Sequence, residues 1–542
     1  MVLRHKIQAV LLPWAIAHGS CLHAQSEITT RIPSEAAGTE GLAVRITVPS
    51  QCRYSEGAPV VIYMAGGFDG IGISERVTGL DGQGFIEIRF NFPGCGTGAN
   101  RSGGGPYDNR GPESLKAARD MCRFAIGSLN DDQNRSLAEL VAPIPSLHGN
   151  VGLVGWSNGG NTNLCLAGIH GQEIPGLAWI VNWESPVGDG MPQAEAGSKE
   201  TSLRPFNPSV NQAYDPDDGE WDLSSLRYDP GIQVPLIEDQ SKRVLGGLYF
   251  DITGDALVTP GKDYIPYPLI FETPDGPKGY YSERLRNAAD SLGILPSNTP
   301  EHIATKEETG EFWSQRNGEY WIGPAMDRLP NLMFMVIAND TDHVQRAADH
   351  PHVLIQYEAF RIAGARFVRL NPDRIYSETL WGSAVPGSAD NPAFVPFDHQ
   401  SIRGAVEPGD ATDDFGYITV GAAGACELAD RTHFDDVRPQ LDAVLTGVRQ
   451  DLNVLPHFHL SQNYPNPFNP STRIRFDVPE PCRVTLRVYD MLGNEAAVLA
   501  DGPYPAGNHA VRFNAAGLPS GLYVVRMEAG GFTASRKMVV VK

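Results

Sequence analysis

Apolar runs and one amphipathic segment alternate along residues 58–183 in the order that a parallel β-sheet requires. Strands of such a sheet carry nearly continuous apolar residues because helices cover both of its faces. The apolar runs are APVVIYM, GFIEIRF, NVGLVGW and GLAWIVNW, and ESLKAARDMCRFAIGSL has helical spacing between the second run and the third. The pattern therefore predicts a doubly wound, mostly parallel α/β sheet.

The same pattern resumes after residue 330 with PNLMFMVI as a strand, HPHVLIQYEAFRIAGA as a helix and ARFVRLN as a further strand. Residues 187–330 separate two core strands and far exceed one crossover helix. We expect them to form a large cap above the carboxyl ends of the strands, where such sheets bind ligands. The whole domain is expected to span residues 25–449.

From Gln462 onward the sequence changes to short runs that alternate apolar and polar residues. Turn residues separate RIRFDV, RVTLRVYD, HAVRFNA, GLYVVRMEA and SRKMVVVK, which is typical of a small antiparallel β-sandwich. We therefore expect a linker at residues 450–461 and a separate all-β, Ig-like domain at residues 462–542.

Motifs in this C-terminal segment closely resemble a known family. YPNPFNPST at residues 464–472 is followed by VYDMLG, PAGNH, GLPSGLY and RKMVVVK. Together they resemble the C-terminal sorting domain of proteins that the bacterial type IX secretion system exports. The resemblance implies this machinery as a partner, and passage across the outer membrane to the cell surface or the medium.

The first residues fit such an export route. Arg4 and Lys6 precede an apolar run that ends at Ala17, and small residues follow, as in a secretory signal peptide cleaved after Ala24. The signal peptide is therefore expected at residues 1–24. Since no other apolar run approaches the roughly 20 residues that cross a bilayer, we expect no integral membrane span.

Charge narrows the range of partners. The net charge is -21, although residues 462–542 hold nine Lys or Arg and only six Asp or Glu, so the acidic excess belongs to the larger domain. Nucleic acid and anionic membranes both require a basic surface. We therefore expect no nucleic-acid partner, and a small-molecule or peptide substrate instead.

The stretch VGLVGWSNGGN places Ser157 between Gly155 and Gly159 at the end of an apolar run. In a chain with 58 glycines this G-x-S-x-G pattern decides little by itself, so its position matters. It falls where the predicted strand 151–156 meets a helix, and small residues allow a turn tight enough to lift the serine away from the sheet. We interpret Ser157 as a nucleophile, and a helix-capping serine is the alternative.

The segment GWSNGG resembles the nucleophile elbow of the α/β-hydrolase fold, in which serine, acid and histidine follow one another along the chain. The resemblance implies an oxyanion hole formed by the backbone N–H of Asn158 and a second N–H from the loop AGGF. Gly67 or Phe68 is the expected second donor. A serine–histidine–acid mechanism of acyl transfer, without a cofactor, follows from this resemblance.

Three carboxylates are candidates for the acid. Asp342 follows the apolar strand PNLMFMVI, and its segment DHV resembles the corresponding part of the family. Asp340 is the second choice. Glu184, after the strand GLAWIVNW, is the third, because some relatives place their acid there.

Two histidines are candidates for the base. His399 lies in the loop PFDHQSIRG, and His433 directly precedes DDVRPQLDAVL, which has the pattern of a closing helix. We favour His399 slightly, because His433 can equally pack on the first turn of that helix. More than 25 residues separate Leu370 from either histidine, which departs from the short spacing of the family.

The segment DITGDALVTPGKD resembles a decayed calcium loop, with Asp251, Asp255 and Asp263 as oxygen donors. Ala256 replaces the usual glycine, and the bidentate glutamate is missing, so we expect no metal there.

Our interpretation is a secreted serine hydrolase that cleaves a carboxylic ester. A serine peptidase of the same fold and a non-catalytic surface-binding protein are the alternatives.

Overall fold

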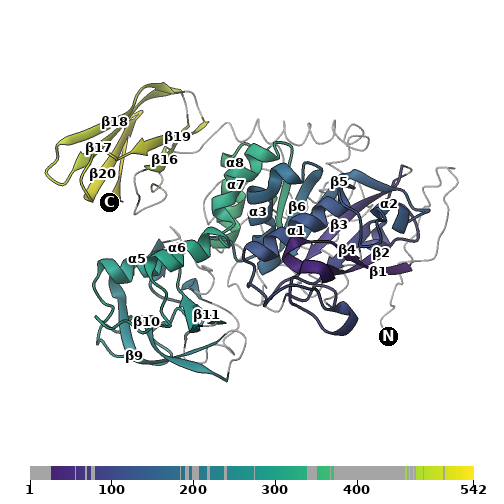
Figure 1. The fold of residues 1–542 in the computed structure, drawn as a ribbon. Helices are drawn as coiled ribbons and strands as arrows, with labels where there is room; N and C mark the ends of the chain where they lie inside the picture. Colours follow the sequence, from purple (N-terminus) through teal and green to yellow (C-terminus); the bar gives the residue numbers. More distant parts are fainter. Residues whose placement is uncertain are drawn as a thin grey trace, which may run out of the picture. The chain divides into compact units, whose positions relative to one another are not determined.

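The computed structural model divides the chain into two compact units, Met1–Phe434 and Asp435–Lys542 (Figure 1). It describes residues 26–337, 351–370 and 458–541 apart from short gaps. These gaps are residues 55, 68–69, 75–79, 184, 189–194, 198–206, 216–219, 237–240, 274, 366–367, 461–462, 464–467, 469–470, 480 and 505–506.

An eight-stranded sheet in the order β1-β2-β4-β3-β5-β6-β13-β14 forms the centre of the first unit. The strands β4 to β14 in this order run parallel, and β1 and β2 add an antiparallel edge. This confirms the predicted α/β class with a mostly parallel sheet. The strand bounds are β1 Ser26–Ile32, β2 Leu42–Val48, β3 Ala58–Met64, β4 Ile86–Phe90, β5 Ser146–Trp156, β6 Leu177–Trp183, β13 Met333–Ile337 and β14 Val368–Leu370.

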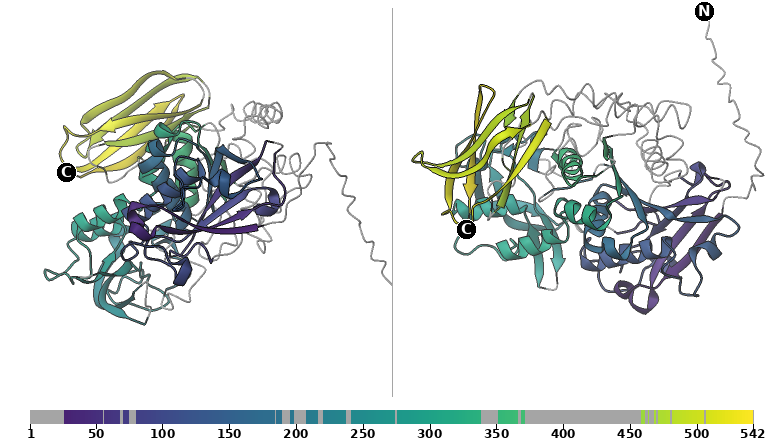
Figure 2. Two further views of the ribbon diagram at one scale, coloured as in Figure 1. Left: turned by 45° about the vertical axis from the view of Figure 1, so that its right-hand side comes forward. Right: turned by 90° about the horizontal axis from the view of Figure 1, so that it is seen from above.

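Four helices lie side by side against this sheet (Figures 1 and 2). They are α1 (Pro112–Ala125), α3 (Asn158–His170), α7 (Glu319–Arg328) and α8 (Pro351–Ile362). Neighbours in this order contact one another, and α3 also packs on β3, β5 and β6. All seven residues of β3 are buried, as expected for a strand covered on both faces. Among the described helices, none combines the length and the apolar character needed to cross a bilayer.

The segment between β6 and β13 folds around small cores of its own. Besides α7, its described elements include paired strands and two helices: β7 (Tyr214–Asp215), β8 (Glu220–Trp221), β9 (Leu226–Pro235), β10 (Arg243–Phe250), β11 (Leu269–Thr273), β12 (Gly276–Tyr280), α5 (Glu283–Ser291) and α6 (Lys306–Ser314). Most of its aromatic rings, including Phe250, Tyr264 and Trp313, are buried in these cores. Its α7 packs on α3 and so belongs to the helix layer. The bounds of the cap stay a prediction.

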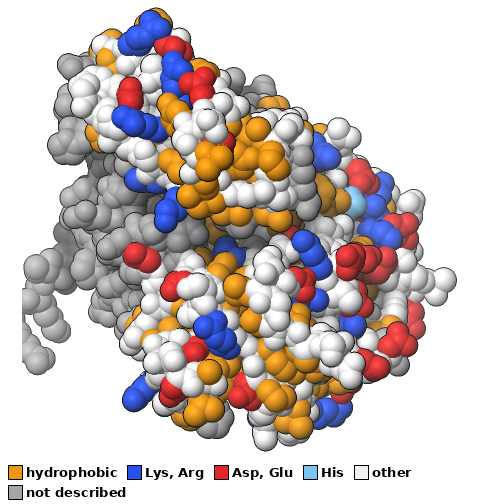
Figure 3. Space-filling view, turned by 90° about the vertical axis from the view of Figure 1, so that its left-hand side faces the viewer, with side chains coloured by type: hydrophobic (Ala, Val, Ile, Leu, Met, Phe, Trp, Pro, Cys, Tyr) orange, Lys and Arg blue, Asp and Glu red, His pale blue; other side chains and the backbone are white. Residues whose placement is uncertain are grey.

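The described part of the second unit, residues 458–541, is an all-β sandwich, as predicted. A three-stranded sheet β15-β16-β19 and a four-stranded sheet β18-β17-β20-β21 share one apolar core. Alternate residues of these strands point into it. On the face shown in Figure 3, Lys and Arg side chains lie among Asp and Glu side chains. The strands are β15 His459–Leu460, β16 Ser471–Val478, β17 Cys482–Asp490, β18 Glu495–Tyr504, β19 Gly507–Asn514, β20 Gly521–Ala529 and β21 Phe532–Val540.

Two glycines of β5 give a direct test of how tightly the sheet packs. A Cβ at Gly152 would overlap the fully buried ring of Trp179, whose indole N–H donates to Asn150 Oδ1 (3.0 Å). A Cβ at Gly149 would meet no atom within 4 Å. We predict that Gly152→Ala lowers the free energy of unfolding by about 1–3 kcal/mol, whereas Gly149→Ala changes it little. Denaturant titration followed by tryptophan fluorescence measures both, and equal effects would contradict this packing.

Candidate active site

Ser157 occupies the turn between β5 and α3, and its backbone is strained. Its φ of 50° and ψ of -125° are rarely adopted by residues other than glycine. The N–H of Ser157 donates to the carbonyl of Trp183 (2.8 Å), and its own carbonyl accepts from the N–H of Gly160 (3.0 Å). The serine stands at the N-cap position of α3, but its side chain makes no capping hydrogen bond. The helix-capping interpretation therefore does not describe its hydroxyl.

Glycines around Ser157 allow backbone segments to touch. A Cβ at Gly155 would overlap the backbone of Gly160. A Cβ at Gly159 would overlap the carbonyl oxygen of Met64 and lie 2.7 Å from the carbonyl oxygen of Ala65. The first turn of α3 thus passes directly over the end of β3, and any larger residue at these positions would push the two apart.

The loop after β3 lies against this turn. A Cβ at Gly66 would come within 2.8 Å of the Trp156 ring, and Gly67 has a left-handed φ of 60°. The side-chain amide of Asn158 donates to the carbonyl of Gly67 at 3.3 Å. The structure therefore brings together Ser157, Asn158 and Gly67, three of the residues predicted for the site. Phe68 lies outside the described residues.

Arg110 also contacts this loop, and sequence reasoning missed it. Its side chain is buried, and Nη2 donates to the carbonyls of Ala65 and Gly66, each at 2.7 Å. The guanidinium lies over the ring of Phe92, 4.4 Å from its centroid. Arg110 sits in a polar, glycine-rich loop, where an arginine is ordinarily interpreted as solvent-exposed. No motif or spacing in the sequence marks Arg110 as a residue of the site.

A chain of buried amides lies beneath the turn. Asn182 on β6 donates through Nδ2 to the carbonyl of Gly160 (3.0 Å) and to Oε1 of Gln356 (2.9 Å). Asn163 on α3 donates to Oδ1 of Asn182 (3.1 Å). All three side chains are fully buried. This network ties the first turn of α3 to α8, the helix that follows the segment holding Asp342.

The segment that follows α6 forms hydrogen bonds near the turn at Ser157. Arg316 donates to the carbonyls of Asp108 (2.6 Å) and Asn109 (2.8 Å), and Asn161 on α3 binds the backbone of Arg316 and Gly318. Burial lowers the pKa of the Arg316 guanidinium, and the carboxylate of Asp108 opposes that effect. These contacts connect the segment after α6 to α3 and to the residues that precede Arg110.

The other predicted residues of the site are not described by the structure. Asp342, Asp340 and Glu184, the candidate acids, lie outside the described residues. The same holds for His399 and His433, the candidate bases. Their roles stay predictions.

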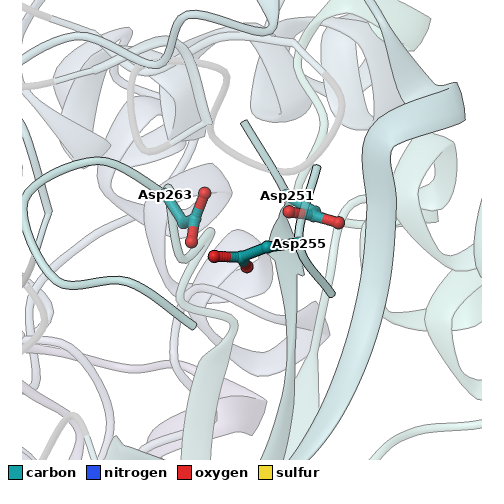
Figure 4. Close-up of side chains that lie close together, drawn as sticks. All are labelled: Asp251, Asp255 and Asp263. Atoms are coloured by element: carbon teal, nitrogen blue, oxygen red, sulfur yellow. The ribbon is translucent and has the colours of Figure 1, made fainter. Parts of the chain in front are cut away.

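The three aspartates of the loop at residues 251–263 lie together (Figure 4). One carboxylate oxygen from each aspartate lies within 4.8 Å of the chosen oxygens of the other two. Asp263 accepts the backbone N–H groups of Ile252 (2.8 Å), Thr253 (3.0 Å) and Thr259 (2.7 Å), and Asp251 accepts those of Gly254 (2.8 Å) and Ala256 (3.1 Å). The buried carboxylates are thus engaged by the backbone of their own loop.

Comparison with known proteins identifies one part of the chain. Residues 462–541 match the family model of the secretion system C-terminal sorting domain. A search of curated proteins found no match.

Several solved structures resemble the chain at low identity. An α/β hydrolase, GrgF from Penicillium sp. sh18, is 14% identical over 62% of this chain and 85% of its own, with a TM-score of 0.28. One of two fungal esterases from Rhizomucor miehei is 10% identical over 64% and 74%, with a TM-score of 0.32. A prolyl endopeptidase is 15% identical over 30% and 22%, with a TM-score of 0.22. At this level, similarity says nothing of what this chain binds or cleaves.

The hydrogen bonds of Asp263 predict a strong effect of its removal. Asp263→Ala leaves three backbone N–H groups without their acceptor, so we predict a loss of about 1–3 kcal/mol in the free energy of unfolding. Asp255 is exposed and, within the described part of the chain, accepts only the N–H of Leu257 (2.9 Å), so Asp255→Ala is the control and is expected to cost below about 0.5 kcal/mol. Denaturant unfolding measures both variants, and a larger loss in Asp255→Ala would refute this account of the loop.

Proposed function

We propose that this chain, which carries a secretion system C-terminal sorting domain at residues 462–541, is a serine hydrolase that cleaves carboxylic esters outside the cell. The sorting domain directs the protein to the cell surface or the extracellular space, and we expect the type IX machinery to recognise it. One observation carries the proposal of serine chemistry. Ser157 is held at a φ of 50° where β5 of a parallel sheet meets the N-terminus of α3.

The proposed reaction begins with attack of Ser157 Oγ on the ester carbonyl carbon. His399 or His433 takes the hydroxyl proton, and Asp342 orients the imidazole. The tetrahedral intermediate then collapses, the C–O bond to the alcohol breaks, and the histidine returns the proton to the leaving alkoxide. Water, activated by the same histidine, hydrolyses the acyl-enzyme and regenerates Ser157.

The position of the oxyanion hole is supported by local geometry. The first N–H groups of an α-helix have no acceptor within the helix and carry the positive end of its dipole. Asn158 is the first residue of α3, and Gly67 lies in hydrogen-bond contact with its side chain. Backbone donors of this kind are each worth about 3 kcal/mol in the transition state of acyl transfer.

An ester is the favoured substrate because an alkoxide leaves with less help from a general acid than an amine does. A peptidase of the same fold is the alternative. A surface-binding protein without turnover is the second alternative, and it would keep the turn at Ser157 without a base. Chemical labelling and substrate choice separate the three.

We predict that a fluorophosphonate probe labels the folded wild-type protein and that Ser157→Ala abolishes this labelling. Phosphonylation requires an activated hydroxyl, so a serine without a general base would not react. Ser128→Ala, which alters an exposed serine three residues after the end of α1, is the matched control and should label normally. Mass spectrometry of the labelled peptide identifies the residue. An unlabelled wild-type protein would favour the surface-binding alternative.

The base can be identified with His399→Ala and His433→Ala. We expect one of them to lower kcat/KM on short p-nitrophenyl esters by at least about 1,000-fold, because an activated serine depends on its base. The other variant should stay close to wild type and serves as the control. Aminoacyl anilides, tested in parallel, rank peptidase against esterase activity. Full turnover in both variants would eliminate the proposed mechanism.

A further inference from the structure

We propose that Arg110 is a positioning residue of this site, which sets the direction of the Gly67 N–H toward the oxyanion. The inference rests on the proposed function and adds a residue to it. It follows from how Arg110 holds the loop after β3.

The guanidinium of Arg110 hydrogen-bonds to the loop after β3. The side chain is only 5% exposed, and Nη2 donates to two successive carbonyls, Ala65 and Gly66, at 2.7 Å each. Nε and Nη1 are buried and have no hydrogen-bond partner among the described residues. Arginine is seldom fully buried without a paired carboxylate, and the described part of the chain supplies Arg110 with none. Two backbone carbonyls and the face of Phe92 are its neighbours instead.

Because the peptide group is planar, a hydrogen bond that fixes one carbonyl also sets the direction of the next backbone N–H. In a trans peptide the C=O of one residue and the N–H of the next point in opposite directions within one rigid plane. A bond that fixes the carbonyl of Gly66 therefore fixes the N–H of Gly67. The side-chain amide of Asn158 holds the following carbonyl, that of Gly67, at 3.3 Å. The loop is thus fixed at three successive carbonyls, two of them by Arg110.

The loop needs this restraint because of its composition. Gly66 and Gly67 have the widest conformational freedom of any residue type, so the peptide between them would otherwise rotate easily. Larger residues are excluded: a Cβ at Gly66 would come within 2.8 Å of the Trp156 ring, and Gly67 has a φ of 60°. An external hydrogen-bond donor is therefore the available means of ordering this loop.

Arg110 is itself held firmly in place. Asn109 and Arg110 have φ values of 52° and 66°, a conformation that costs free energy for residues other than glycine. Arg316 supports it by donating to the carbonyls of Asp108 and Asn109. The buried positive charge of Arg110 lies beside the loop where the substrate carbonyl would gain negative charge, so it favours the transition state electrostatically as well.

The test compares Arg110→Met, which removes the donor and the charge, with Arg110→Lys, which keeps a cationic donor. Arg286→Met is the matched control, because Arg286 is also buried and donates to a backbone carbonyl, that of Ala304 (2.8 Å), within the insertion. Each protein is used as the full chain, and its concentration of reactive serine is titrated with the fluorophosphonate. The readouts are kcat and KM on a p-nitrophenyl ester, and the affinity for phenylboronic acid, which forms a tetrahedral adduct with serine.

We expect Arg110→Met to lower kcat by about 10- to 100-fold with KM within about 3-fold, and to weaken boronate binding by a similar factor. Arg110→Lys should recover much of both quantities, and Arg286→Met should leave them unchanged. If Arg110→Met fails to fold, Arg110→Gln is judged by the same readouts. Wild-type kcat and boronate affinity in a folded Arg110 variant would overturn the inference while leaving the serine mechanism intact. Failure of the probe to label wild type would overturn both.

Discussion

The backbone of α3 runs so close to the end of β3 that no side chain fits between them. Gly159 lies against the carbonyls of Met64 and Ala65, and Gly155 lies against Gly160. This contact brings the strand–helix turn and the loop after β3 into one small region. Every other feature of the candidate site depends on it, since it places Ser157, Asn158 and Gly67 within reach of one another.

Three sets of polar side chains stabilise the region where α3 approaches the end of β3. Arg110 binds the loop after β3. Asn182 binds the carbonyl of Gly160 and is itself hydrogen-bonded to Asn163 and Gln356. Arg316 binds the carbonyl of Asn109, the residue before Arg110. Buried polar groups are costly unless they are satisfied, so such groups specify one arrangement when their bonds are made. The strain at Ser157 can persist because so many neighbouring contacts define its surroundings.

The sequence was most informative where one physical rule dominates. Burial on both faces gives the apolar runs of β3, β5 and β6, and alternation marks the strands of the C-terminal sandwich. The edge strand β1 was missed because its SEITTRI is largely polar, and β18 was missed because EAAVLADGPY does not alternate. Glycine spacing located Ser157 and its neighbours. Arg110 was not predictable, since its role arises from a contact between residues some 45 positions apart. For the base, more than 25 residues separate Leu370 from either candidate histidine, so the spacing in the sequence selects neither of them.

A crystal structure of the protein carrying a phosphonate adduct would test the central claim most directly, since the adduct mimics the tetrahedral intermediate. The account predicts phosphorus bonded to Ser157 Oγ and one phosphoryl oxygen about 2.7–3.1 Å from the backbone N–H groups of Asn158 and of Gly67 or Phe68. An adduct on another residue, or a phosphoryl oxygen directed away from both donors, would contradict it.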